Sequence, residues 1–99
     1  MNIVKNLEND KLTVAVEGRL DTTTAPELEQ ALSTSLDGVK DLVLDFASLE
    51  YVSSAGLRVL LSTQKAMLAK GSMKLINVND SIMEVFDITG FADVLTIEK

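Results

Sequence analysis

Hydrophobic positions along the chain first alternate and later recur every three or four residues, so the pattern predicts strands followed by a succession of helices and strands. Short aliphatic segments at residues 2–7 and 12–17 flank the polar run Glu8-Asn9-Asp10-Lys11. This arrangement is typical of two antiparallel strands joined by a four-residue connection. Alternation is clearest in the second segment, which therefore has one apolar face.

A helical period begins after Thr24. Thr24 fits an N-cap, Pro26 suits the first helical turn, and Glu27 stands where the partner residue of a capping box is expected. Gly38 marks the predicted end of this helix. The apolar residues of its inner face are Leu28, Ala31, Leu32 and Leu36.

A second pair of elements follows. Residues 39–46 hold a compact apolar run, typical of a central strand covered on both faces. The next helix is predicted from Ser54, as its N-cap, to about Lys70, and we expect it to be the most buried helix. Its polar stripe contains Arg58, Ser62, Lys65 and Ala69, and its apolar face contains Leu57, Val59, Leu60, Leu61, Met67 and Leu68.

The remaining elements complete the predicted fold class. A strand at 73–78, a helix capped by Asp80 or Ser81 that runs to about Ile88, and a short strand at 94–97 follow Gly71. The order β-β-α-β-α-β-α-β predicts one α/β domain over residues 1–99. Its mixed sheet has an N-terminal hairpin, parallel strands joined by right-handed crossovers, and helices packed on it.

The loops that follow parallel strands gather at one edge of such a sheet. We therefore expect the segments Asp21 to Thr23, Ser53 to Gly56 and Asn77 to Asn79 to lie together there. That edge is the candidate functional surface.

Composition restricts the possible functions. The chain has 99 residues, of which 46% are hydrophobic, enough for the core of one domain. Fifteen acidic residues against nine basic ones give a net charge of −6, without a basic cluster, which argues against nucleic-acid binding. No segment approaches the roughly 18 apolar residues of a membrane span, and cysteine is absent, so we expect a soluble cytoplasmic protein without a membrane partner.

Catalysis and metal binding are not expected. A nucleophilic Ser54 would need a base, but the chain has no histidine, and Lys65 and Lys70 lie too far along the same helix. The glycine pattern of a phosphate-binding loop is also absent, so no cofactor is expected. No metal is expected either, because four loop and strand-end carboxylates lack a recognised ligand spacing. These are Asp21, Asp41, Asp45 and Glu50.

Two motifs resemble those of the STAS domain family, to which bacterial anti-sigma factor antagonists belong. The run Ser53-Ser54-Ala55-Gly56-Leu57 after an apolar strand resembles the family signature Asp-Ser-(small)-Gly-(aliphatic). The run Gly18-Arg19-Leu20-Asp21, followed by three threonines, resembles its second element, and the resemblance extends to about Phe91. One departure is that Ser53 stands where many members have aspartate.

The resemblance implies a binding module switched by phosphorylation. It implies that Ser54 is the phosphoacceptor, with Ser53 as second choice, that an anti-sigma factor serine kinase is the partner, and that a serine phosphatase resets the switch. Capture of the kinase by the unphosphorylated protein would release a sigma factor. The implied partner-binding residues are Asp21, Thr22, Thr23, Ser53, Ser54, Ala55, Gly56, Leu57 and Arg58.

Plainer alternatives remain at this point. Ser54 could serve only as an N-cap, Asp21 only as an Asx-turn residue, and Arg58 only as a solvated charge. The domain could also be an unphosphorylated STAS scaffold in a signalling or lipid-transport assembly.

Overall fold

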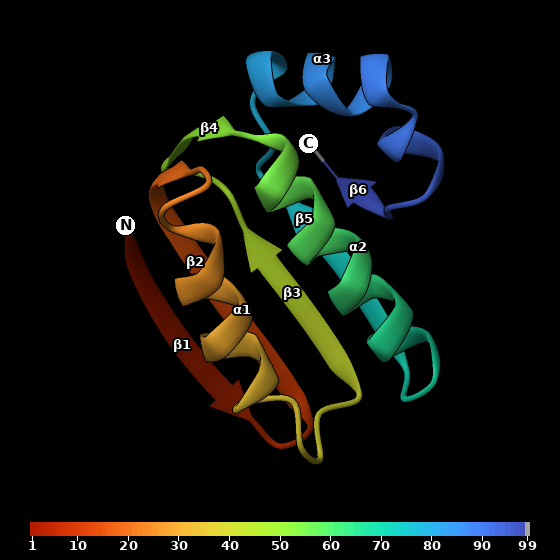
Figure 1. Ribbon diagram of the computed structural model, residues 1–99. Coiled ribbons are helices and arrows are strands. Elements are labelled where there is room, and N and C mark those ends of the chain that lie inside the picture. Colours follow the sequence, from red (N-terminus) through yellow and green to blue (C-terminus); the bar gives the residue numbers. More distant parts are fainter. Residues whose placement is uncertain (99) are drawn as a thin grey trace.

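A computed structural model describes residues 1–98 as a mixed sheet with helices against it (Figure 1), which confirms the predicted α/β class. The order is β-β-α-β-β-α-β-α-β, with a 3-10 turn before the last strand. The elements are β1 (Asn2–Glu8), β2 (Lys11–Leu20), α1 (Ala25–Ser33), β3 (Asp41–Asp45), β4 (Leu49–Val52), α2 (Ser54–Leu68), β5 (Ser72–Ile76), α3 (Asp80–Thr89), η1 (Phe91–Asp93) and β6 (Ile97–Glu98).

The sheet combines one antiparallel pair with parallel pairs. Its main path runs β1-β2-β3-β5-β6, and β4 pairs with the end of β2 beside that path. Strands β1 and β2 form the predicted hairpin, although its turn contains only Asn9 and Asp10, with Asn9 at a φ of 57°. All other pairs are parallel, so the loops after β2, β4 and β5 lie at one end of the molecule (Figure 1).

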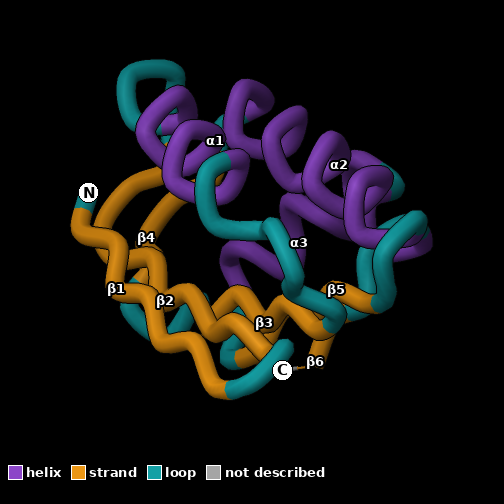
Figure 2. The backbone as a smooth tube through the Cα atoms, turned by 90° about the horizontal axis from the view of Figure 1, so that it is seen from below, coloured by secondary structure: helices purple, strands orange, loops and turns teal. Residues whose placement is uncertain are grey.

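Helices α1 and α2 pack side by side on the same face of the sheet (Figure 2). Seven residues of α2 are buried, against three of α1 and two of α3, which confirms that α2 is the most buried helix. The core is aliphatic apart from Phe46 and Phe86, both fully buried. In β3, Leu42, Val43 and Leu44 are all buried, as the compact apolar run predicts.

Strand β4 is absent from the sequence-based prediction. It has only four residues, and because Leu49 and Val52 are buried while the two residues between them are exposed, it lacks the alternation that identifies a strand. Its pairing with β2 also depends on an irregularity in register between Gly18 and Arg19, where Gly18 has a φ of +98°. The strand therefore exists because of a tertiary pairing that local sequence does not encode.

The predicted start of α1 is confirmed, because Thr24 is its N-cap residue, but its predicted end at Gly38 is wrong. The helix ends at Ser33, and Leu36 is buried from the loop that follows, so the apolar pattern continued past the helix itself. Thr24 occupies the N-cap position without a side-chain cap, because its hydroxyl oxygen accepts from the backbone N–H of Asp21 at 2.8 Å while its hydroxyl donates to the carbonyl oxygen of Arg19 at 2.7 Å. The predicted capping box with Glu27 is therefore not formed.

Several later boundaries also differ from the prediction. Asn79, and neither Asp80 nor Ser81, caps α3 by accepting from the N–H of Ile82 at 2.8 Å. Strand β5 ends at Ile76. Strand β6 starts at Ile97, and not at Val94 as predicted, because the N–H groups of Val94 and Leu95 both donate to the carbonyl oxygen of Phe91 and continue the η1 turn. Leu68, predicted on the inner face of α2, is 69% exposed.

Gly56 lets α2 approach the end of β2. A Cβ added at Gly56 would lie 2.6 Å from Cγ and 2.9 Å from Cδ2 of Leu20, distances that force a displacement. We expect Gly56→Ala to lower the free energy of unfolding by about 1–3 kcal/mol, although alanine is the better helix former. Urea unfolding would measure the loss.

The matched control for Gly56→Ala is the double variant with Leu20→Ala. Removing the Leu20 side chain costs about 2–5 kcal/mol alone. It also removes the two shortest contacts and leaves only the Leu20 carbonyl oxygen, at 3.1 Å from the added Cβ. The double variant should therefore lose at least about 0.5 kcal/mol less than the sum of the two separate losses. Strict additivity would show that steric conflict with Leu20 is not the cause.

Gln64 is a buried polar residue of α2 without a partner for its carbonyl oxygen. The side chain is 8% exposed, and its Oε1 accepts no hydrogen bond within residues 1–98. Replacement by methionine keeps the approximate shape and removes the unpaired acceptor, so Gln64→Met should raise the free energy of unfolding by about 1 kcal/mol. The same change at the exposed Gln30 of α1 is the control and should leave stability within about 0.5 kcal/mol.

Candidate functional site

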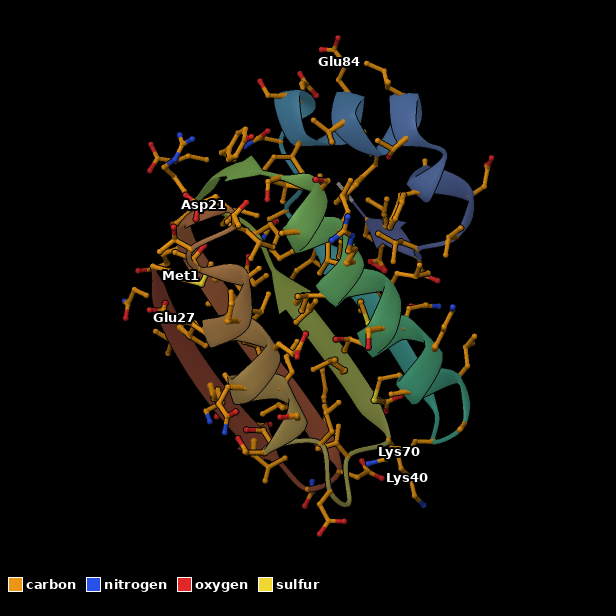
Figure 3. All side chains as sticks on the ribbon, in the orientation of Figure 1. Met1, Asp21, Glu27, Lys40, Lys70 and Glu84 are labelled. Atoms are coloured by element: carbon orange, nitrogen blue, oxygen red, sulfur yellow. The ribbon has the colours of Figure 1, made fainter. Side chains whose placement is uncertain are left out.

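The predicted functional edge forms where β2 and β4 end. The backbone N–H of Ser53 donates to the carbonyl oxygen of Leu20 at 2.8 Å, which holds the β4–α2 corner against the end of β2. The β2–α1 loop starts immediately after Leu20, and Figure 3 shows its Asp21 at the end of the molecule opposite Lys40 and Lys70. The segments that begin at Asp21 and Ser53 are therefore neighbours, as predicted.

The N-cap of α2 is Ser53, so the prediction that Ser54 caps this helix is wrong by one residue. Ser53 has extended backbone angles, φ −100° and ψ 175°, and its Oγ accepts from the N–H of Gly56 at 3.4 Å. Its carbonyl oxygen accepts the first helical bond, from the N–H of Leu57 at 2.9 Å. Ser53 is therefore the N-cap residue, the role that the sequence analysis assigned to Ser54.

Ser54 is the first residue of α2 and is exposed. Its hydroxyl makes no hydrogen bond to any of residues 1–98, whereas Ser53 is half-buried and its hydroxyl is engaged in the cap. The first-turn position also places Ser54 at the positive end of the helix dipole. Two adjacent serines thus differ sharply in access and in hydrogen bonding.

Asp21 organises the β2–α1 loop. Its Oδ1 accepts from the N–H of Thr23 at 3.0 Å and from the N–H of Thr24 at 3.1 Å, the Asx-turn arrangement that the plainer alternative predicted. The bond from the Thr24 N–H is the main reason that the pKa of the Asp21 carboxyl lies below its ordinary value of 3.8. The Thr23 N–H, the Thr24 hydroxyl and the Arg19 guanidinium lower this pKa further. Thr22 and Thr23 are exposed beside it.

An arginine and a tyrosine next to Asp21 form a pair that sequence analysis missed. The guanidinium carbon of Arg19 lies 4.3 Å from the ring centre of Tyr51, and its Nε lies 3.9 Å from Oδ2 of Asp21. Arg19 and Tyr51 are register partners on β2 and β4. Because β4 was not predicted, no sequence signal placed them together.

A groove between α1 and α2 opens beside the same edge. It has a volume of about 370 Å³, with Thr22 at the loop end and Arg58 on α2. Its lining is completed by Ala25, Pro26, Glu29, Ala55, Val59 and Ser62. Sequence analysis placed Ala55 and Arg58 on the functional surface, but periodicity within single helices does not reveal a groove between two of them.

The third predicted segment is tied to the same edge through structural bonds. Asn77, with a φ of 57°, donates from Nδ2 to Oδ1 of Asp45 at 3.0 Å. Asn79 caps α3 and donates from Nδ2 to the carbonyl oxygen of Leu49 at 3.1 Å. Both amides thus hold the loop against the end of β3 and the start of β4.

Neither a metal site nor a membrane-spanning helix is found among residues 1–98. No three histidine, cysteine, aspartate or glutamate residues of this part of the chain are placed to hold a metal ion. None of the helices described there is long and apolar enough to cross a membrane.

Comparison with known proteins identifies the family. The family model of the STAS domain matches residues 2–99. The chain belongs to the STAS domain family. Its fold agrees with that assignment, because the anti-sigma factor antagonist SpoIIAA superposes with a TM-score of 0.84 in its unphosphorylated form. That comparison covers 99% of this chain and 89% of SpoIIAA at 18% identity.

Curated STAS relatives match over nearly their whole length. The anti-sigma-B factor antagonist of Bacillus subtilis is 36% identical over 101 residues, which cover 98% of this chain and 92% of that protein. The anti-sigma-B factor antagonist of Staphylococcus aureus strain NCTC 8325 is 31% identical over 101 residues, covering 100% of this chain and 94% of that protein. These similarities extend well beyond the two short motifs that first suggested the family.

The lowered pKa of Asp21 predicts a specific acid sensitivity. A carboxylate whose pKa is depressed by folding stabilises the fold above its unfolded pKa, and this contribution is lost as the pH falls through the folded value. Between about pH 5 and about pH 2.5, wild type should therefore lose more stability than Asp21→Asn, whose amide oxygen still accepts the loop N–H bonds. Urea unfolding at both pH values would test this. Equal losses would show that Asp21 ionisation does not contribute.

Proposed function

We propose that this STAS protein is an anti-sigma factor antagonist whose affinity for an anti-sigma factor serine kinase is switched by phosphorylation of Ser54. The observation that carries the proposal is the exposed, unengaged hydroxyl of Ser54 at the start of α2, beside a serine whose hydroxyl is already used. The names of the curated relatives, anti-sigma-B factor antagonists, support the same function.

The choice of Ser54 over Ser53 follows from the two environments. A kinase must reach the hydroxyl and align it with a phosphate donor, and only Ser54 is exposed. Modification of Ser53 would break its bond to the Gly56 N–H and would crowd a half-buried corner. Ser54 is therefore the primary phosphoacceptor and Ser53 the second choice.

The departure from the family signature at Ser53 has a physical explanation compatible with switching. Serine and aspartate are both strong N-caps, because each side chain offers an oxygen to the N–H groups of the first turn. Ser53 fills that position in this chain. Exchange of aspartate for serine thus retains the start of α2 and changes only the fixed charge beside Ser54.

The switch acts through charge. A phosphate on Ser54 adds about −1.5 to −2 charges and three acceptor oxygens to a surface that also carries Asp21. A partner packed against a neutral hydroxyl would meet an unfavourable, strongly hydrated anion. Because the helix N-terminus tolerates an anion, the backbone is expected to remain in place while the affinity falls.

The proposed partner-binding surface contains the β2–α1 loop and the first turn of α2. The residues assigned to it are Asp21, Thr22, Thr23, Ser53, Ser54, Ala55, Gly56, Leu57 and Arg58. Gly56 and Leu57 are buried, so they shape the corner, whereas Thr22, Thr23, Ser54 and Arg58 offer exposed side chains. A serine phosphatase would reset the switch, and the antagonist itself would act in the cytoplasm as a binding protein without catalysis, metal or cofactor.

The second candidate is an unphosphorylated STAS scaffold, favoured by the loss of the aspartate before Ser54. In that case the same surface would bind its partner permanently. Genes for a serine kinase of the anti-sigma type and for a phosphatase beside this one would favour the switch.

The experiment mixes the purified protein with the candidate anti-sigma kinase and ATP, then locates phosphate by mass spectrometry. We expect one phosphate in wild type and in Ser53→Ala, and none in Ser54→Ala. Binding of the kinase with ADP should weaken by at least about tenfold once Ser54 is phosphorylated, since burying a charge without a partner costs more than about 1.4 kcal/mol.

The outcomes separate the two candidates. No phosphate on any sample, with a kinase active on its usual substrate, would favour the scaffold. Phosphate retained in Ser54→Ala but lost in Ser53→Ala would move the switch to the second serine.

A further inference from the structure

We propose that Arg58 holds the phosphate of phosphorylated Ser54 within the same helix, so that modification adds an anion and removes a cation from the surface at once. The inference rests on the proposed function only in taking Ser54 as the modified residue. It concerns a side chain that makes no hydrogen bond, ion pair or ring contact within residues 1–98.

The spacing on α2 supplies the geometry. Ser54 and Arg58 are four residues apart in a regular helix, so they lie one turn apart on the same side. Helical side chains lean toward the N-terminus, which directs the long Arg58 side chain back toward the first turn. The anion lies N-terminal to the cation, the favoured order for such a pair.

Arg58 is available for this contact. Its side chain is exposed and makes no hydrogen bond, ion pair or ring contact within residues 1–98. Arg19, the other arginine at this edge, is instead stacked on Tyr51 and lies beside Asp21.

One carboxylate competes for Arg58. Glu29 of α1 lines the same groove, but it forms no ion pair within 4.0 Å with Arg58 in the part of the chain that is described. A phosphate dianion carries more charge than a carboxylate and offers oxygens for two parallel N–H bonds from guanidinium. It should therefore bind Arg58 in preference to Glu29.

The pairing makes phosphorylation a double change at the groove. In the unmodified protein, Arg58 is free to meet a carboxylate of a partner that packs along α1 and α2. In the phosphorylated protein the guanidinium is neutralised locally, and the partner loses that contact in addition to meeting the phosphate. Replacement of Arg58 by an uncharged residue should therefore weaken partner binding even before phosphorylation.

The test installs phosphoserine at position 54 by genetic encoding, so it needs neither kinase nor partner. The second ionisation of the phosphate is followed by phosphorus NMR during a pH titration of the full chain. With Arg58 present, its midpoint should lie lower, by about half a pH unit, than in the Arg58→Gln variant, because the guanidinium favours the dianion. Lys65→Gln, which removes a cation farther along the same polar stripe, is the matched control and should leave the midpoint unchanged.

A second variant guards against indirect effects. Arg58→Lys keeps the charge but not the forked donors, so it should recover part of the lowered midpoint. Equal midpoints in the wild-type and Arg58→Gln backgrounds would overturn the pairing. Failure of the kinase to modify Ser54, or of the partner to bind, would instead refute the proposed function and would leave this titration standing.

Discussion

The candidate site depends on the parallel pairing of β4 with the end of β2. That pairing sets Ser53 against Leu20 through a backbone hydrogen bond and starts α2 where Gly56 passes closest to the Leu20 side chain. Because any side chain at Gly56 would displace Leu20, packing between a helix and a strand explains the glycine of the family motif. The hydroxyls of the corner are therefore positioned by the core.

The apolar core and the charged groups of the candidate site occupy separate parts of this molecule. The core beneath α1 and α2 is almost entirely aliphatic, while the charged groups of the site lie at the end of β2, on the β2–α1 loop and on the exposed side of α2. Asp21 stabilises its own loop through backbone N–H groups, whereas Arg19 is stacked on Tyr51. Ser54 and Arg58 have exposed side chains that make no hydrogen bond or ion pair within residues 1–98.

The sequence predicted what depends on local order and missed what depends on contacts between distant segments. Apolar spacing predicts the hairpin and the three helices. The rule that parallel strands end at one edge predicts that Asp21 lies beside the α2 corner. Strand β4 was missed because its four residues form a strand only by pairing with β2. The cap was assigned to Ser54 because two adjacent serines suit that position equally, and only the backbone angles distinguish them. The groove and the Arg19–Tyr51 stack likewise required knowledge of which elements are neighbours.

The amide bonds of Asn77 and Asn79 have a consequence for the kinetics of recognition. Asn77 is bonded to the end of β3 and Asn79 to the first residue of β4, so the short strand that leads to the Ser53 corner is held at its start whether or not a partner is bound. A braced surface loses little conformational entropy on association, and little of the interaction energy is consumed in ordering it. Release of a partner should then depend on the lifetime of the contacts themselves, without a slow rearrangement of the loops.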